Sequence, residues 1–276
     1  MNYRILHTYC LLIVRFFIKA IHVTGTENVP KKGSVIFAGT HPNSFIDGMI
    51  VNLTFHRPIW SLARGDAFGN KWAKKFMHSI KLMPIYRLSE GREHLSKNDS
   101  TFNSIQELLE RGEGLCIFSE GICTNQTKLL PLKKGTARMV QSAWEADIDT
   151  VVFPVGLTYS NFDKIVKTVN LNFGEAIVRK DFENVPQNTF LVNFNRTLKS
   201  RLEEQLSWVF KPGTFFDNPL YYIGWVINFP WYFLCRFTVN KLTKGTVFTD
   251  SVYFASLILT LPIYWGILIV LYNVIF

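Results

Sequence analysis

The chain has 276 residues, of which 48% are hydrophobic and 15% aromatic, and a formal net charge of +9. This length accommodates one large domain or one domain with appendages, and the positive charge favours a membrane surface, an anionic substrate or nucleic acid as partner. Paired zinc ligands and an aromatic RNA-binding box are missing from the sequence, so we expect no nucleic acid. The four cysteines are scattered without a CxxC pair, which argues against a disulfide framework and a metal site. Reduced thiols, no metal and no cofactor are expected.

Residues 1–24 are predicted to form an interfacial, membrane-anchoring helix. The apolar residues of this segment are interrupted by arginine, lysine and histidine, and no cleavage site follows a clean apolar core, which argues against a signal peptide. Basic and large apolar side chains that interleave in this way are typical of a helix in the membrane interface. A helix that packs on the protein's own core is the alternative.

Apolar runs alternate with amphipathic segments through residues 25–212, the expected catalytic domain. The expected strands are 34–38, 58–63, 82–86, 115–119, 151–157 and a last strand over 171–178. The expected helices are 44–54, 66–79, 99–111, 135–146 and 188–210. This alternation predicts an α/β fold with a mainly parallel sheet flanked by helices.

The end of the chain, residues 213–276, contains two nearly uncharged runs, 220–235 and 252–276. The second run is long enough to cross the hydrocarbon core of a bilayer. If both runs crossed, the basic loop Arg236–Lys244 would lie outside, against the positive-inside tendency. We therefore expect 220–235 to be interfacial or re-entrant while only the last run crosses, or the two to form a shallow hairpin. Because all the motifs precede residue 160, deletion of 250–276 is expected to leave the catalytic fold intact.

A histidine and a carboxylate, His41 and Asp47, follow the predicted strand 34–38. A histidine at such a position can act as a general base, and a neighbouring carboxylate can fix its tautomer and stabilise the imidazolium. Six positions along a continuous helix would turn the two side chains apart, so the pair requires His41 to lie in the loop before the helix. The other five histidines are interpreted as structural.

Two further polar groups are predicted at strand ends. Glu120 and Gly121 follow strand 115–119, and Arg87 follows strand 82–86. Ligands bind at the carboxyl edge of such sheets, so these residues and His41 are expected in one site. Lys128 and Lys133 add positive charge suited to a phosphate, although at least one nearby lysine is expected to be solvated surface. The sequence has no G-x-S-x-G elbow, P-loop or dinucleotide-binding glycine motif.

Four blocks together resemble the glycerolipid acyltransferases, the family of lysophosphatidic acid and glycerol-3-phosphate acyltransferases. The blocks, in the family's order, are His41 to Asp47, Met83-Pro84-Ile85-Tyr86-Arg87, Phe118-Ser119-Glu120-Gly121 with 130–137, and 152–157. The resemblance implies that His41 is the general base and that Asp47 orients it. It implies that Arg87, Glu120 and Gly121 bind the acceptor. Asn43, Lys128 and Lys133 are further expected substrate-binding residues.

The chain departs from the family pattern at two points. Five residues separate His41 from Asp47 where four are usual, which resembles a subset whose motif begins His-Pro-Asn. Ile122 and Cys123 stand where the family usually has Thr-Arg after Glu-Gly. Lys128 or Lys133 is expected to replace the charge of that arginine, though not its bidentate fork.

The function implied by the resemblance is a membrane-bound O-acyltransferase that uses acyl-CoA or acyl-ACP and gives phosphatidic acid. Lysophosphatidic acid is the leading acceptor, glycerol-3-phosphate is the close alternative, and a non-catalytic lipid-binding homologue is the alternative of another class. Membrane lipids are further expected partners. The catalytic domain is expected on the cytosolic side of a membrane, either the bacterial inner membrane or, alternatively, the endoplasmic reticulum.

Overall fold

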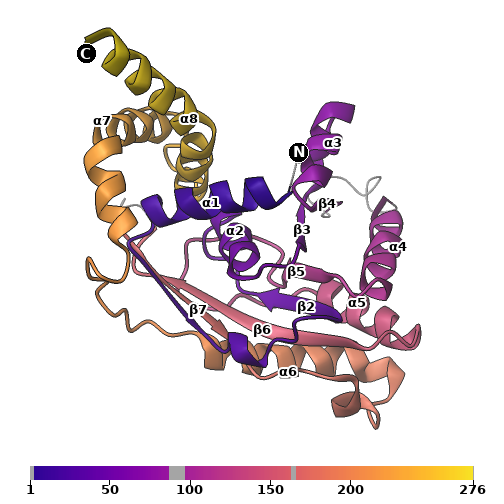
Figure 1. Cartoon of the computed structure of the whole chain (residues 1–276). Coiled ribbons are helices and arrows are strands. Elements are labelled where there is room, and N and C mark those ends of the chain that lie inside the picture. Colours follow the sequence, from indigo (N-terminus) through magenta and orange to yellow (C-terminus); the bar gives the residue numbers. More distant parts are fainter. Residues whose placement is uncertain (1–2, 87–96, 163–165, 276) are drawn as a thin grey trace.

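A seven-stranded sheet forms the centre of the computed structural model (Figure 1), which describes residues 3–86, 97–162 and 166–275. The strands are β1 Ala20–Thr24, β2 Ser34–Gly39, β3 Ile59–Arg64, β4 Leu82–Ile85, β5 Gly114–Phe118, β6 Thr150–Tyr159 and β7 Thr168–Phe173. The helices are α1 Tyr3–Phe17, α2 Phe45–Thr54, α3 Lys71–Ser79, α4 Lys97–Glu110, α5 Lys134–Glu145, α6 Phe190–Gln205, α7 Pro219–Leu242 and α8 Thr249–Ile275.

The sheet has the order β1-β7-β6-β2-β5-β3-β4 and is mainly parallel, which confirms the predicted fold class. The exception is the antiparallel pair β6–β7. The central strand β2 lies between β5 and β6 and is parallel to both. The carboxyl ends of these three strands therefore meet at one edge of the sheet, where the loop after β2 and the loop after β5 begin.

Helices cover both faces of the sheet (Figure 1). One layer contains α1, α2, α7 and α8, and the other contains α4, α5 and α6. Side chains of β2 alternate between the two layers: Val35 and Phe37 pack on the first, and Ile36 and Ala38 on the second. Because both faces are covered, every residue of β2 is buried. This burial explains its uninterrupted apolar sequence.

The N-terminal segment differs from the prediction of one helix over residues 1–24. The helix ends at Phe17, and residues 20–24 form β1, which pairs with β7 at an edge of the sheet. Pairing with β7 satisfies the backbone groups of residues 20–24 and sets them in the sheet. One face of α1, including Ile13 and Val14, is buried against α2 and the C-terminal helices.

The predicted last strand over 171–178 is present only up to Phe173, where β7 ends, and its second part, residues 176–178, is wrong. Ile177 makes only an isolated bridge with Val152.

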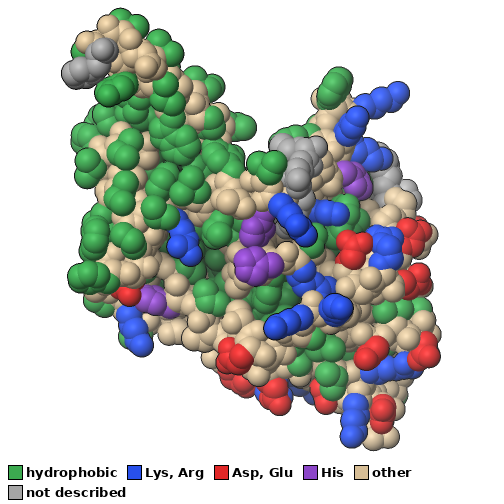
Figure 2. All heavy atoms as spheres, in the orientation of Figure 1, with side chains coloured by type: hydrophobic (Ala, Val, Ile, Leu, Met, Phe, Trp, Pro, Cys, Tyr) green, Lys and Arg blue, Asp and Glu red, His purple; other side chains and the backbone are tan. Residues whose placement is uncertain are grey.

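The C-terminal helices α7 and α8 pack against each other and form what we call the C-terminal hairpin. Their outer surface is apolar, as the column of hydrophobic side chains in Figure 2 shows. Its large exposed side chains include Val226, Phe229, Phe233, Phe237, Leu259, Ile263, Ile269, Val270 and Val274. Among the described residues, α8 is the one helix long and apolar enough to cross a membrane. Arg236, predicted in a loop, lies within α7 and faces the buried Asp250.

Candidate active site

The loop that carries His41 begins at the carboxyl end of β2 and is fixed to the neighbouring strand. The Thr40 N–H donates to the Val155 carbonyl at 3.1 Å, and the Thr40 hydroxyl accepts from the Leu157 N–H at 3.0 Å. Thr40 is buried. The chain therefore enters the loop from a rigid position, and His41 is the first residue beyond it that is partly accessible.

The predicted contact between His41 and Asp47 is present. The His41 Nδ1 atom lies 2.9 Å from Asp47 Oδ2. An ionised carboxylate only accepts hydrogen bonds, so Nδ1 carries the proton and Nε2, on the other side of the ring, keeps its lone pair. The ring stacks on Phe118 with centroids 4.2 Å apart and planes 5° apart. This arrangement fixes both the tautomer and the ring plane, as a general base requires.

The additional residue in the motif is accommodated at Ser44. This residue has a φ of 53°, where side chains other than glycine are rarely found. The Asp47 N–H then donates to the Ser44 carbonyl at 3.1 Å, so the chain turns sharply before α2 begins. Backbone strain of this kind costs roughly 1–3 kcal/mol and occurs where the surrounding structure compensates for it. The turn is what lets His41 and Asp47 meet across six positions.

Asp47 is completely buried and accepts three hydrogen bonds. Besides His41, the donors are the Asn43 N–H at 2.8 Å and the Tyr159 hydroxyl at 2.7 Å. Burial raises the pKa of the Asp47 carboxyl, while these hydrogen bonds oppose the shift. Burial and the neighbouring Asp47 raise the pKa of Tyr159 well above its ordinary value, so its hydroxyl stays protonated and donates. Sequence reasoning missed Tyr159, whose only signal is its position two residues beyond the fourth motif block.

Glu120 links the His41 loop to the loop after β5. One carboxyl oxygen accepts from the His41 N–H at 2.8 Å and the other from the Leu130 N–H at 3.0 Å. The side chain is buried, and burial raises the pKa of its carboxyl. Glu120 was predicted to bind the acceptor, but in this structure it holds two backbone segments together.

Gly121 forms the turn that follows Glu120. Its φ is +70°, its N–H donates to the Phe118 carbonyl at 3.0 Å, and an added Cβ would lie 2.9 Å from Lys133 Cγ. This amide is therefore used within the turn. The side chains of Lys128 and Lys133 are exposed. Lys128 lines a small crevice together with Glu120.

Asn43 does not lie at the open side of the site. Asn43 is completely buried, and its Nδ2 atom donates to Asp250 Oδ2 at 2.9 Å, so the side chain faces the C-terminal hairpin rather than a substrate. Arg87 lies outside the described residues. The strand before it, β4, is at the edge of the sheet, three strand spacings from β2. Those spacings amount to about 14 Å.

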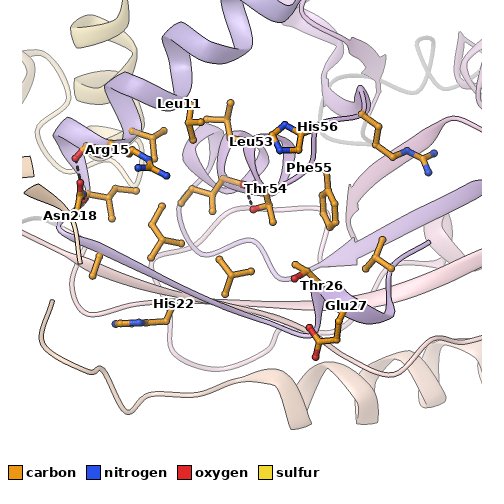
Figure 3. A pocket seen from close by; sticks show the side chains of 18 of the residues that line it. Leu11, Arg15, His22, Thr26, Glu27, Leu53, Thr54, Phe55, His56 and Asn218 are labelled. Carbon is orange, nitrogen blue, oxygen red and sulfur yellow. Dashed lines mark hydrogen bonds between the residues drawn. The ribbon is translucent and has the colours of Figure 1, made fainter. Parts of the chain in front are cut away.

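A cavity of about 1090 Å³ lies away from His41, between α1, β1 and the end of α2 (Figure 3). Thr54 and His56 line it, seven and nine positions after Asp47. Seven residues of helix correspond to a rise of about 10 Å. The cavity is thus at the opposite end of α2 from the hydrogen-bonded pair His41 and Asp47, which we call the dyad. We place the candidate active site at the dyad because the polar side chains converge there.

Comparison with known proteins identifies the family. The family model described as acyltransferase matches residues 20–158, about half of the chain, and this range includes His41, Asp47 and Glu120. The chain belongs to the acyltransferase family.

Two relatives support this assignment. A 1-acyl-sn-glycerol-3-phosphate acyltransferase of Bacillus subtilis (strain 168) is 25% identical over 185 residues, which are 67% of this chain and 87% of the relative. The crystal structure of the 1-acyl-sn-glycerophosphate (LPA) acyltransferase PlsC from Thermotoga maritima has the same fold, with a TM-score of 0.54 and 17% sequence identity. The match covers 76% of this acyltransferase and 81% of the Thermotoga chain.

Proposed function

We propose that this acyltransferase transfers a fatty acyl group from an acyl thioester, acyl-CoA or acyl-ACP, to lysophosphatidic acid, which gives phosphatidic acid. The observation that carries the proposal is the His41–Asp47 contact of 2.9 Å at the end of β2, in a chain that is similar to 1-acylglycerol-3-phosphate acyltransferases. A hydroxyl acceptor needs a base and a thioester donor needs none, so a single oriented histidine is sufficient for the transfer.

In the proposed mechanism His41 Nε2 removes the proton of the acceptor hydroxyl while the hydroxyl oxygen attacks the thioester carbonyl. Asp47 stabilises the imidazolium that forms. The tetrahedral intermediate then collapses: the carbon–sulfur bond breaks, and the imidazolium returns its proton to the leaving thiolate. The products are an ester and a free thiol, and the enzyme regains its starting protonation state. No acyl-enzyme is formed.

The acceptor phosphate is proposed to bind Arg87 together with Lys128 or Lys133. Both lysines are exposed on the loop after β5, which Glu120 ties to His41. A lysine supplies a mobile point charge for a phosphate, and an arginine supplies a planar fork. Lys128 lines the crevice beside Glu120, where its charge would suit an anionic headgroup.

The proposed location is a membrane, with the catalytic domain on its cytosolic side. Contacts hold α7 near both of its ends: Asn218, just before α7, donates to the Ile18 carbonyl at 2.9 Å, and Arg236 faces Asp250 of α8, which in turn accepts from Asn43 of the His41 loop. This supports an α7 that lies on the membrane surface. The end of α8 extends away from the domain (Figure 1), and the length and hydropathy of α8 suit a span.

The function is tested by acyl transfer assays with purified protein. Lysophosphatidic acid and glycerol-3-phosphate are offered as acceptors, and acyl-CoA and acyl-ACP as donors. We expect phosphatidic acid as the product and a loss of about 10²–10⁴-fold in kcat for His41→Ala. His56→Ala is the matched control, because His56 is exposed at the far end of α2. Wild-type turnover in His41→Ala would refute the mechanism, and transfer to glycerol-3-phosphate alone would correct the acceptor.

A further inference from the structure

The start of α8 contacts the loop that carries the candidate dyad, although Asn43 and Asp250 are 207 positions apart in the sequence. Asn43 Nδ2 donates to Asp250 Oδ2 at 2.9 Å. The Ser251 hydroxyl donates to the Asn43 carbonyl at 2.8 Å and accepts from the Ile46 N–H at 3.4 Å. Asn43 and Ile46 lie on the two sides of the strained residue Ser44, so α8 holds the turn from both sides.

Asp250 is itself held by two cations, Lys167, which is buried, and Arg236, which is partly buried. It forms an ion pair with Lys167, the residue before β7, and both side chains are almost completely buried. Arg236 of α7 lies 3.8 Å from the second carboxyl oxygen of Asp250. A buried carboxylate is tolerated only with such partners. The position of Asp250 is therefore fixed by β7, α7 and α8 together.

The contact extends from Asp250 to the dyad in two steps. Hydrogen bonds to Asp250 and Ser251 hold Asn43 in place. The Asn43 N–H in turn donates to Asp47 Oδ2 at 2.8 Å. The same oxygen accepts the hydrogen bond from His41 Nδ1. A shift of Asn43 would therefore remove one of the hydrogen bonds that hold the Asp47 carboxylate in line with the imidazole.

We infer that Asp250 and Ser251 are positioning residues for acyl transfer: they hold Asn43 and the strained turn so that Asp47 stays aligned with His41. The C-terminal hairpin is then a working part of the active site as well as a membrane attachment. Neither residue touches the dyad, and the effect passes through Asn43. The inference rests on the proposed function for its kinetic test, and on geometry for its second test.

A matched pair of double variants isolates the hydrogen bond to Asn43. Lys167→Met combined with Asp250→Asn, and Lys167→Met combined with Asp250→Leu, both remove the buried ion pair. Only the asparagine retains an oxygen that accepts from Asn43 Nδ2. We expect kcat of the leucine variant to be about 10- to 100-fold below that of the asparagine variant, because small misplacements of catalytic groups cost this much. The KM for the acceptor should stay unchanged, since the phosphate contacts are elsewhere.

Equal kcat values in the two folded double variants would overturn the inference. If the leucine variant does not fold, Ser251→Ala and Ser251→Thr decide: loss of the hydroxyl should lower kcat, and threonine should restore it. Equal activity of these two variants would also overturn it. Thr260→Val is the control within the hairpin, because it removes the hydrogen bond from Trp231 without touching the loop.

A second readout is independent of the reaction. We expect the His41 Nδ1 proton, which is hydrogen-bonded to Asp47, to give a separate downfield proton resonance in the wild-type protein. We expect this resonance in the asparagine double variant and its loss in the leucine double variant; a retained resonance would contradict the inference. If wild-type protein transfers no acyl group to any acceptor, the proposed function fails, while the resonance still decides on the positioning.

Discussion

At the scale of single residues, Asp47 carries the strongest constraint, because one buried carboxyl accepts hydrogen bonds from His41, Asn43 and Tyr159. Asp47→Asn can preserve this geometry: the amide oxygen accepts from His41 and Asn43, and the amide N–H₂ donates to Tyr159. The charge that stabilises the imidazolium is lost. We expect a fall in kcat smaller than the about 10²–10⁴-fold loss from removal of the base, measured in the acyl transfer assay.

The same substitution has a consequence for stability that depends on pH. Burial raises the pKa of Asp47 in the folded protein above its ordinary value, which is about 3.9. At pH values between the pKa of Asp47 in the unfolded state and its higher pKa in the folded state, the folded state binds more protons. The unfolding free energy of the wild-type protein therefore falls as pH rises through this range. Asparagine lacks this dependence. The Tm of Asp47→Asn relative to wild type, measured in detergent, should therefore increase as pH rises from about 4, and a constant difference would contradict this cause.

Ser44 allows a prediction about the unusual length of the motif. Its positive φ makes a β-branched side chain strongly unfavourable, whereas glycine adopts this conformation without strain. We expect Ser44→Gly to keep its stability within about 1 kcal/mol and to remain active. Ser44→Val should lose roughly 1–3 kcal/mol and most of its kcat. Thermal unfolding and acyl transfer rates check this pair. Similar stability and activity of both variants would show that the conformation of Ser44 does not determine the contact between His41 and Asp47.

At the scale of elements, the expectation that residues 250–276 can be removed without harm to the catalytic fold conflicts with the structure. Deletion of this segment removes Asp250 and Ser251 and leaves Lys167 buried without its carboxylate. We expect this truncation to unfold or to lose activity. Deletion of 267–276 is the matched control: residues 267–275 are all exposed, so the shorter truncation should keep the fold and lose only membrane affinity. Assays of both truncations in detergent test this, and full activity without residues 250–276 would refute it.

The sheet and its parallel character follow from local patterns in the sequence. Uninterrupted apolar runs such as β2 require cover on both faces, and the alternation with helices leaves few other arrangements. The dyad could be predicted for a similar reason, since the motif lies within nine residues. The contacts of Asn43 with Asp250 and of Asp47 with Tyr159 span 207 and 112 positions. Single-sequence periodicity carries no information about such pairs. The prediction of helix beyond Phe17 failed because residues 20–24 form a strand only through their pairing with the distant strand β7.

At the scale of the whole molecule, the contacts at both ends of α7 determine the expected topology. The turn between α7 and α8 lies beside the His41 loop, because Asp250 immediately follows it. Lys241 at the end of α7 and Lys244 in the turn, both on the side of the catalytic domain, also agree with the positive-inside tendency. We therefore expect Lys244 on the same side of the membrane as the catalytic domain, and the end of α8 on the other side.

Cysteine accessibility in sealed vesicles tests this topology. Lys180→Cys reports the catalytic domain, Lys244→Cys the turn, and Asn273→Cys the end of α8; all three positions are exposed in the structure. In vesicles where a membrane-impermeant thiol reagent labels Lys180→Cys, it should also label Lys244→Cys and leave Asn273→Cys unlabelled until the bilayer is dissolved. Unmodified protein provides the background from the native cysteines, three of which are buried. Protection of Lys244→Cys would mean that α7 crosses the membrane, which would separate Asp250 from Asn43 and remove the basis for both the topology and the positioning role.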